Sequence, residues 1–259
     1  MKAIALTIRL DSLYSIRIPY TWQSALAYPL PPPSTIIGML TNALQRYKND
    51  KPPLYYLDKV EENVIWAGAR LRLLSPAVVK SYTTSAITKW EVELGGKSTN
   101  ALGRQYVFTK NVEVVAVIDE ETFAQELVNI LPSVPITCGD SESIATVENI
   151  KPLLETKLRE FPPDTVFETE FPIPFNLQKI EIIEGSGRLY LVHERCKKRG
   201  KEFPLVNYLF PLREENNILH PTKFTIRIKQ PVFILEIEDV GKVISVPKDV
   251  LDSLRETAI

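Results

Sequence analysis

The most restrictive stretch of this sequence is residues 28–47, where a proline-rich lead passes directly into a helical pattern. The prolines are tolerated at a helix start because a missing N–H has no intrahelical partner there. Ser34 or Thr35 is expected to be the N-cap, with its side-chain oxygen accepting from a backbone N–H one turn on. The apolar residues that follow recur at helical spacing along one face: Ile36, Met39, Leu40, Ala43, Leu44 and Tyr47.

Gly38 interrupts this helix, and a glycine in a helix interior costs about 1 kcal/mol relative to alanine. Two explanations remain open. Another backbone packs closely against the first turn, or a ligand approaches the helix start, where free N–H groups and the helix dipole favour a phosphate. From this stretch alone, close packing is the preferred explanation.

The charge balance limits the partners that suit this chain. Lysine and arginine number 31 against 32 acidic residues, a net charge of −1, so a nucleic acid would have to be held by local patches. No apolar run approaches the roughly 20 residues that cross a bilayer, and no signal-peptide pattern is present, so no membrane association is expected. Two lone cysteines, Cys138 and Cys196, indicate a reducing cytoplasm.

The first half of the chain alternates strands and helices in a recognisable order. The period-two pattern of residues 2–10 predicts a half-buried strand, and Asp119 is expected to cap a second helix. Residues 80–105 are rich in serine and threonine around a Gly-Gly pair, which predicts a protruding hairpin. Further strands are expected at residues 64–74, with Arg70 and Arg72 on one face, at residues 111–118 and within residues 136–150.

This order predicts an α+β fold of the ferredoxin-like, RRM-like kind for residues 1–150, the arrangement of RNA-recognition modules. No aromatic RNA-recognition signature lies on the expected third strand. Prolines mark a seam at residues 151–175, after which a β-rich C-terminal domain is expected over residues 151–259. Its predicted hairpins join residues 179–183 to 188–193 and residues 232–238 to 242–246, with a short helix from Lys248.

Residues suited to catalysis or metal binding are few. His193 and His220 are the only histidines, which limits acid–base mechanisms. A structural zinc needs four ligands, and only Cys138 could join the His193 and Cys196 pair. The sequence therefore predicts no catalytic residue, no metal and no cofactor.

Basic and aromatic residues form three more promising groups. Each alone suits a solvated loop, but three on a nearly neutral chain favour a groove for single-stranded nucleic acid. The first group precedes the helix and comprises Arg17, Tyr20, Trp22 and Tyr28. The second lies in the predicted hairpin and comprises Lys89, Trp90, Lys97 and Arg104. The third is a possible basic patch comprising Arg195, Lys197, Lys198, Arg199 and Lys201.

Two segments carry a family resemblance: residues 15–19 read SIRIP, and residues 28–40 read YPLPPPSTIIGML. Together they resemble the N-terminal signature of the CRISPR-associated family five proteins of the RAMP superfamily. Residues 139–143 (GDSES) and 207–210 (NYLF) resemble archaeal, type I-A-like members. Those proteins hold the 5′ handle of the guide RNA (crRNA) in type I Cascade surveillance complexes. They have a ferredoxin-like domain with an inserted β-hairpin thumb, which agrees with the excursion at about residues 80–105.

The resemblance implies roles for particular residues. Arg17, Tyr20 and Trp22 would lie in the loop near the handle, and Ser34, Thr35 and Gly38 would form the helix start that faces the RNA. Lys89, Trp90 and Lys97 would lie in the thumb that folds over the guide, beside the hairpin's Arg104. The partners implied are crRNA and the backbone and large subunits of Cascade, in a cytoplasmic ribonucleoprotein of antiviral defence.

Three functions stay open. The favoured one is a non-catalytic subunit that binds and caps the 5′ handle. Some family members cleave precursor RNA with tyrosine, lysine and histidine, but neither histidine here lies in the N-terminal domain or the thumb. The second function, a metal-independent precursor endonuclease, would have to work without a histidine in those parts of the chain. The third is a structural interaction module without RNA contact.

Overall fold

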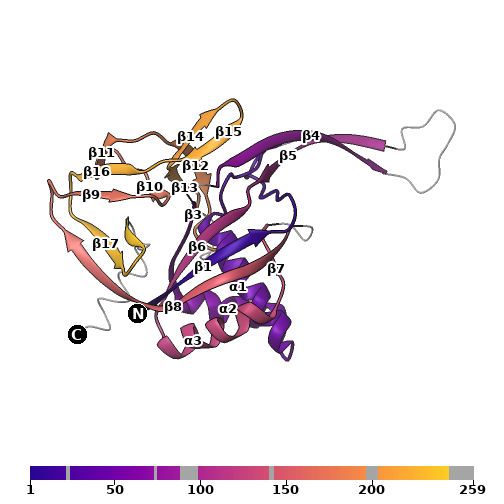
Figure 1. Ribbon diagram of the computed structural model, residues 1–259, viewed down its shortest axis with the longest axis horizontal. Coiled ribbons are helices and arrows are strands. Elements are labelled where there is room, and N and C mark those ends of the chain that lie inside the picture. Colours follow the sequence, from indigo (N-terminus) through magenta and orange to yellow (C-terminus); the bar gives the residue numbers. More distant parts are fainter. Residues whose placement is uncertain (22–23, 73–74, 88–98, 140–142, 197–203, 245–259) are drawn as a thin grey trace.

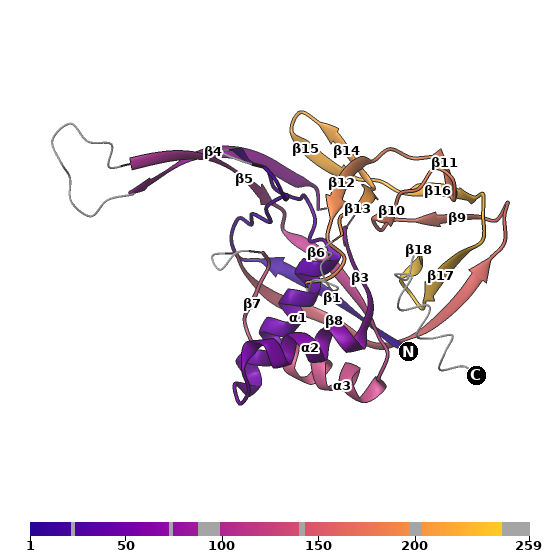
Figure 2. The same ribbon diagram turned by 180° about the vertical axis from the view of Figure 1, so that it is seen from behind.

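A computed structural model describes the chain except for residues 22–23, 73–74, 88–98, 140–142, 197–203 and 245–259 (Figures 1 and 2). It is a mixed α/β, strand-rich structure. The helices are α1 (Pro33–Lys48), α2 (Pro53–Asn63), α3 (Glu121–Ile130) and the 3-10 turn η1 (Leu131–Ser133). The strands are β1 (Lys2–Leu10), β2 (Ser24–Ala25), β3 (Val64–Leu71), β4 (Ala77–Ile87), β5 (Thr99–Phe108), β6 (Asn111–Ile118), β7 (Ile136–Thr137), β8 (Ile144–Phe161), β9 (Val166–Thr169), β10 (Ile173–Pro174), β11 (Ile180–Glu184), β12 (Arg188–Val192), β13 (Val206–Phe210), β14 (Leu212–Glu215), β15 (Ile218–Pro221), β16 (Phe224–Ile228), β17 (Val232–Ile237) and β18 (Gly241–Ile244).

The largest sheet has the order β18-β17-β8-β1-β6-β3, with β7 paired to the start of β8. All of its pairings are antiparallel. Helices α1, α2 and α3 cover one face of this sheet (Figure 1). The strands and helices predicted for residues 1–150 are present in the predicted order, and α2 is an additional helix.

Helix α1 has most of the predicted apolar face, because Ile36, Met39, Leu40, Ala43 and Leu44 are all buried against the sheet. Tyr47, the last residue predicted on this face, is 57% exposed. Its predicted cap is wrong. The N-cap residue is Pro32, in extended conformation and without a side-chain cap, rather than Ser34 or Thr35. The expected cap of α3 is wrong in the same way, because Glu120 rather than Asp119 occupies that position.

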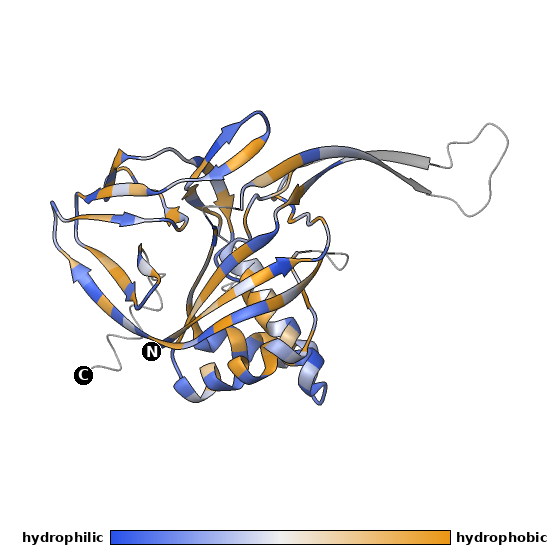
Figure 3. Cartoon of the chain, viewed as in Figure 1, coloured by the Kyte–Doolittle hydropathy of each residue, from blue (hydrophilic) through white to orange (hydrophobic). Residues whose placement is uncertain are grey.

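Strand β1 is buried on both faces, so the prediction of a half-buried strand is wrong. Ile4, Leu6 and Ile8 face the helices, whereas Ala3 and Ala5 face a second apolar cluster. That cluster contains Trp66, Phe171, Leu235 and Ile237, so it is built from both halves of the chain. Figure 3 shows hydrophobic residues on the central strands as well as on the helices below them.

Strands β4 and β5 form the predicted protruding hairpin, with an antiparallel register from the Val78–Phe108 pair to the Ile87–Thr99 pair. The hairpin belongs to a sheet of order β14-β15-β4-β5-β2 and extends away from the body of the molecule (Figure 2). The predicted Gly-Gly turn lies in residues 88–98, outside the described part of the chain.

The hairpin predicted between residues 179–183 and 188–193 is wrong. Both strands exist as β11 and β12, but β11 pairs with β16 and β12 pairs with β13. The glycines between these strands do not form a hairpin turn; they let backbone carbonyls of other segments approach closely. A Cβ on Gly185 would lie 2.2 Å from the Lys223 carbonyl oxygen, and one on Gly187 would lie 2.6 Å from that of Phe210. The β17–β18 hairpin is confirmed, and the helix expected from Lys248 lies outside the described residues.

Strand β8 joins the two halves of the chain. Its first part pairs with β1, and its last part, from Thr156 to Phe161, pairs with β17. The division predicted after residue 150 therefore falls within one continuous strand.

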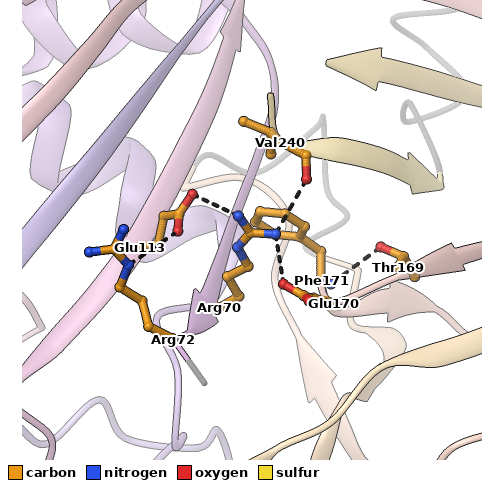
Figure 4. A network of polar contacts seen from close by, with 7 residues as sticks. All are labelled: Arg70, Arg72, Glu113, Thr169, Glu170, Phe171 and Val240. Carbon is orange, nitrogen blue, oxygen red and sulfur yellow. Dashed lines mark hydrogen bonds and ion pairs between the residues drawn. The ribbon is translucent and has the colours of Figure 1, made fainter. Parts of the chain in front are cut away.

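Arg70 on β3 provides a second link between the halves (Figure 4). Its guanidinium contacts Glu113 at 2.9 Å and Glu170 at 2.9 Å and donates to the Val240 carbonyl at 3.3 Å. Arg72 reaches the other oxygen of Glu113 at 3.8 Å, so the predicted common face of the two arginines is confirmed. The network ties β3 and β6 to the β9–β10 connection and the β17–β18 turn.

Candidate nucleic-acid interface

The loop between β1 and α1 is folded against the foot of the hairpin. Tyr14 exchanges two backbone hydrogen bonds with Val107, at 3.0 and 2.8 Å, which fixes the loop against β5. Its phenol is buried and donates to the Pro29 carbonyl. These bonds hold the neighbouring residues 17–21 as part of a short excursion at the surface.

Arg17 and Tyr20 lie on this excursion and face solvent. Arg17 is exposed and donates from Nη2 to the Thr21 carbonyl at 3.0 Å. Tyr20 is 85% exposed and has a φ of 63°, a left-handed conformation that is uncommon for a residue other than glycine. A cation and an exposed aromatic ring are therefore presented together.

The hairpin carries two cations and two rings on one face, here called the basic-aromatic face: Lys80, Tyr82, Arg104 and Tyr106. Lys80 is paired with Tyr106 and Tyr82 with Arg104, and directly opposite residues share a face of the sheet. The Arg104 guanidinium lies 5.1 Å from the Tyr106 ring centroid, and the Tyr82 and Tyr106 rings meet edge-on at 5.8 Å. Tyr82 is 51% exposed, so it can still accept a stacked base.

Arg104 also connects this face to the loop, since its Nε donates to Ser15 Oγ at 3.1 Å. A cleft of about 320 Å³ opens at the foot of the hairpin. Its walls include Ile18 and Leu26 from the loop, Lys80 and Gln105 from the hairpin, and Tyr190 from β12. The loop, the hairpin and the C-terminal half thus share one cleft, and Lys80 and the Arg188–Glu214 ion pair are among the residues that line it.

The start of α1 is engaged by the chain itself. The Ser34 N–H donates to the His193 carbonyl at 3.3 Å, while the Thr35 and Ile36 N–H groups donate to the Pro32 carbonyl. The Cys196 thiol donates to the Ser34 carbonyl at 3.0 Å, and burial raises its pKa to about 12. The first donors of the helix are therefore in use, which removes the simplest reason for a phosphate to bind there.

Gly38 is not explained by close packing among the described residues. A Cβ added at this position would meet no atom within 4 Å in the part of the chain that the structure describes. Close packing against another backbone, the explanation of Gly38 preferred from the sequence, is therefore wrong as far as the described part of the chain is concerned.

A family comparison identifies the kind of protein. The model of the CRISPR-associated protein (Cas_Cas5) family matches residues 5–185, which is most of the chain. The chain belongs to the Cas5 family. The family resemblance expected from residues 15–19 and 28–40 is confirmed.

One solved structure shares the fold of this Cas5 chain, and two others are similar to it with lower scores. A CRISPR protein from Archaeoglobus fulgidus is similar with a TM-score of 0.61 and 14% identity, over 96% of this chain and 100% of that one. A chain of a CRISPR RNA-guided surveillance complex matches with a TM-score of 0.42 and 15% identity over 97% and 98%. A chain of the Type III-B Cmr-beta complex bound to cognate target RNA and AMPPnP matches with a TM-score of 0.49 and 13% identity, over 85% of this chain and 86% of that one. No curated protein sequence matches.

The structure brings some of the predicted Cas5 site residues together and separates others. Arg17, Tyr20 and Arg104 lie on the loop and hairpin surface. Tyr28 is a core residue, 3% exposed, with its phenol donating to the Leu191 carbonyl and its pKa raised to about 12 by burial. Several predicted residues lie outside the described part: Trp22, Lys89, Trp90, Lys97, Lys197, Lys198, Arg199 and Lys201.

Arg195, predicted as part of a basic patch, is buried in this Cas5 protein and bonds to backbone carbonyls. It is 9% exposed, and its Nη1 donates to the Val64 carbonyl at 2.7 Å and the Glu61 carbonyl at 3.3 Å. Cys196 N donates to Glu61 Oε1 at 2.6 Å. The guanidinium therefore holds the end of α2 to the start of β3, a position far from free solvent.

Sequence reasoning missed Tyr82 and Tyr106 and gave Lys80 no role. The signal was available, because each tyrosine lies two residues from a cation on its own strand, and this spacing places both side chains on one face. Among the described residues, no group of three His, Cys, Asp or Glu side chains could hold a metal. None of the described helices is long and apolar enough to span a bilayer.

Proposed function

We propose that this Cas5 protein is a non-catalytic subunit of a type I surveillance complex that binds and caps the 5′ handle of crRNA. The observation that carries the proposal is the basic-aromatic face beside the Arg17–Tyr20 excursion, in a member of a CRISPR-associated family. Cations spaced along a groove follow a phosphate backbone, and exposed rings accept bases.

The proposal assigns a task to each group on this surface. Arg17, Lys80 and Arg104 neutralise phosphates, and each contact adds a counterion-release term to the affinity. Tyr20 and Tyr82 are stacking surfaces, each worth about 1–3 kcal/mol per base. With a net charge of −1, the chain binds RNA through this patch rather than through its whole surface.

The arrangement of the sheet supports a ferredoxin-like, RRM-like N-terminal domain. Strands β8-β1-β6-β3 are neighbours in that order and antiparallel, with α1 and α3 on one face. The hairpin is then the thumb, and the backbone and large subunits of Cascade are the protein partners. We place the assembly in the cytoplasm, in agreement with the two free cysteines, Cys138 and Cys196.

The endonuclease alternative would need an acid–base group at the bound RNA. His193 lies at the end of β12 with Nδ1 3.0 Å from the Pro204 carbonyl, and His220 lies on β15. Replacing both histidines should leave the length and yield of the guide RNA unchanged. Accumulation of uncut precursor in that double variant would support the enzyme instead.

Salt-dependent RNA binding tests the proposal directly. We expect Lys80→Ala and Arg17→Ala each to weaken binding of a handle RNA and to reduce the slope of log K against log salt by about 0.7. Lys179→Ala, which removes an exposed lysine from the turn before β11, is the control and should change neither. Equal slopes for all three variants would contradict phosphate contacts at this surface and favour an interaction module without RNA.

A further inference from the structure

The cleft at the foot of the hairpin lies against the face of the hairpin opposite to the basic-aromatic face. Gln105 and Ser81 are directly opposite each other in the β4–β5 register, and both line the cleft. Each is next in sequence to a member of the basic-aromatic face, and successive side chains of a strand point to opposite sides. Lys80 belongs to the basic-aromatic face and also lines the cleft, so the two surfaces meet at this residue.

The larger part of the cleft lining is apolar and suits a flat ring. It includes Leu26 from the loop, which is 45% exposed, and Tyr190 from β12, which lies beside the foot of the hairpin (Figure 1). The Tyr190 ring packs on Phe210, with 4.8 Å between the ring centroids. The cleft volume of about 320 Å³ is at the lower end of the range of about 300–1,000 Å³ for small-ligand sites. The cleft therefore suits a single base rather than a stacked run of bases.

The side-chain amide of Gln105 is oriented by the loop. Its Oε1 accepts from the Ala27 N–H at 3.0 Å, and because a backbone N–H can only donate, the amide oxygen must be the atom that faces Ala27. The amide nitrogen therefore points away from Ala27, and among the described residues no acceptor is bonded to it. The backbone carbonyl of Gln105 accepts from Ser15 Oγ at 2.9 Å, which holds the residue from a second side. Gln105 thus brings oriented N–H donors to the cleft.

Oriented donors favour a base that presents a carbonyl oxygen, as uracil and guanine do. Glutamine recognises adenine by using its amide oxygen and nitrogen together. In this protein the amide oxygen of Gln105 is engaged by the Ala27 N–H. An adenine amino group at the same place would meet the Gln105 donors without an acceptor, which leaves polar groups unpaired at a cost in affinity.

We propose that this cleft holds one unpaired base of the bound RNA, a uracil or a guanine, and that Gln105 is the residue that selects it. The inference rests on the function proposed above, because Lys80 would hold the phosphate backbone at the point where the base turns into the cleft. The occupant is a base rather than a protein side chain, since the cleft is continuous with the basic-aromatic face at Lys80.

The first test compares the affinities of the full chain for two single-stranded probes, ten-nucleotide oligouridylate and ten-nucleotide oligoadenylate. Gln105→Glu keeps an oxygen for the Ala27 N–H and replaces the donors with an acceptor, so we expect it to lower the ratio of the two affinities about tenfold. Lys80→Ala is the control for a phosphate contact. It should weaken binding of both probes by the same factor and leave their ratio unchanged.

The second test needs no substitution. Oligouridylate that carries 5-iodouridine forms crosslinks to nearby aromatic rings on irradiation, and we expect one of them at Tyr190. Crosslinks confined to Tyr20 and Tyr82 would overturn the proposal. An unchanged affinity ratio in Gln105→Glu, together with a reduced salt slope in Lys80→Ala, would overturn the base site and leave the RNA surface in place. If neither substitution alters the binding of oligouridylate, the base site and the function on which it rests are both wrong, and a side chain of a protein partner becomes the occupant of the cleft.

Discussion

Removing the Arg70 side chain should destabilise the protein by about 2–4 kcal/mol, far more than removing its neighbour Arg72. Arg70 is 15% exposed and its partner Glu113 is 12% exposed, so Arg70→Ala would leave a largely buried carboxylate. Breaking a buried ion pair from one side costs about 3–5 kcal/mol. The cost is reduced here because Glu113 keeps Arg72 at 3.8 Å and because Glu170 is 41% exposed. The lost bond to the Val240 carbonyl and the lost stacking on Phe171, 4.8 Å away, add to it.

Urea unfolding measures this difference. With a denaturant dependence of about 3 kcal/mol per molar, Arg70→Ala should lower the midpoint by about 1 M. Arg72→Ala is the matched control, because the Arg72 side chain is 53% exposed and exposed pairs contribute about 0–1 kcal/mol. If both variants lose the same stability within about 0.5 kcal/mol, the network in Figure 4 does not join the two halves in the way described.

Three further predictions rest on other parts of the structure. Gly38→Ala should raise stability by up to about 1 kcal/mol, since the added methyl meets no described atom and alanine favours a helix; a lower thermal midpoint would show that something packs there. Cys138 and Cys196, whose pKa values are raised to about 12 by burial, should react slowly with a thiol reagent at pH 8 until the protein unfolds, and fast labelling of native protein would contradict this. Between pH 9 and 12 the buried thiols stay protonated in the folded chain but lose their protons in the unfolded chain, so the free energy of unfolding should fall as pH rises through this range. Replacing Cys138 with alanine should make this fall shallower in pH-dependent unfolding.

Local patterns predicted much of the fold. The apolar face of α1, the strands β1 and β6 and the projecting hairpin follow from spacing within short windows. Strand partners depend on residues far apart in the chain, and there the predictions failed. Two glycines near residue 186 resemble a hairpin turn, yet Gly185 and Gly187 instead allow the backbone carbonyls of Lys223 and Phe210 to approach. The burial of Ala3 and Ala5 could not be predicted because Trp66 and Phe171, which cover them, come from distant strands.

The candidate site was predicted less well than the fold. Arg17, Tyr20 and Arg104 lie on the loop and hairpin surface, where they remain predicted site residues. Arg195 instead bonds to the carbonyls of Glu61 and Val64, which come from a distant part of the sequence. The alternative of a phosphate at the start of α1 depended on free N–H donors. The His193 carbonyl, more than 150 residues away in sequence, accepts one of them.

The long strand β8 also has a consequence for how the chain folds during synthesis. Strand β1 needs β8 along one edge, and the Lys2–Glu155 pair joins residues 153 apart in sequence. At about 5–20 residues per second, the ribosome delivers the second strand roughly 8–30 seconds after the first. During that interval the apolar strand β1 has an unpaired edge. In a growing chain, this edge therefore remains without its native partner until β8 has emerged.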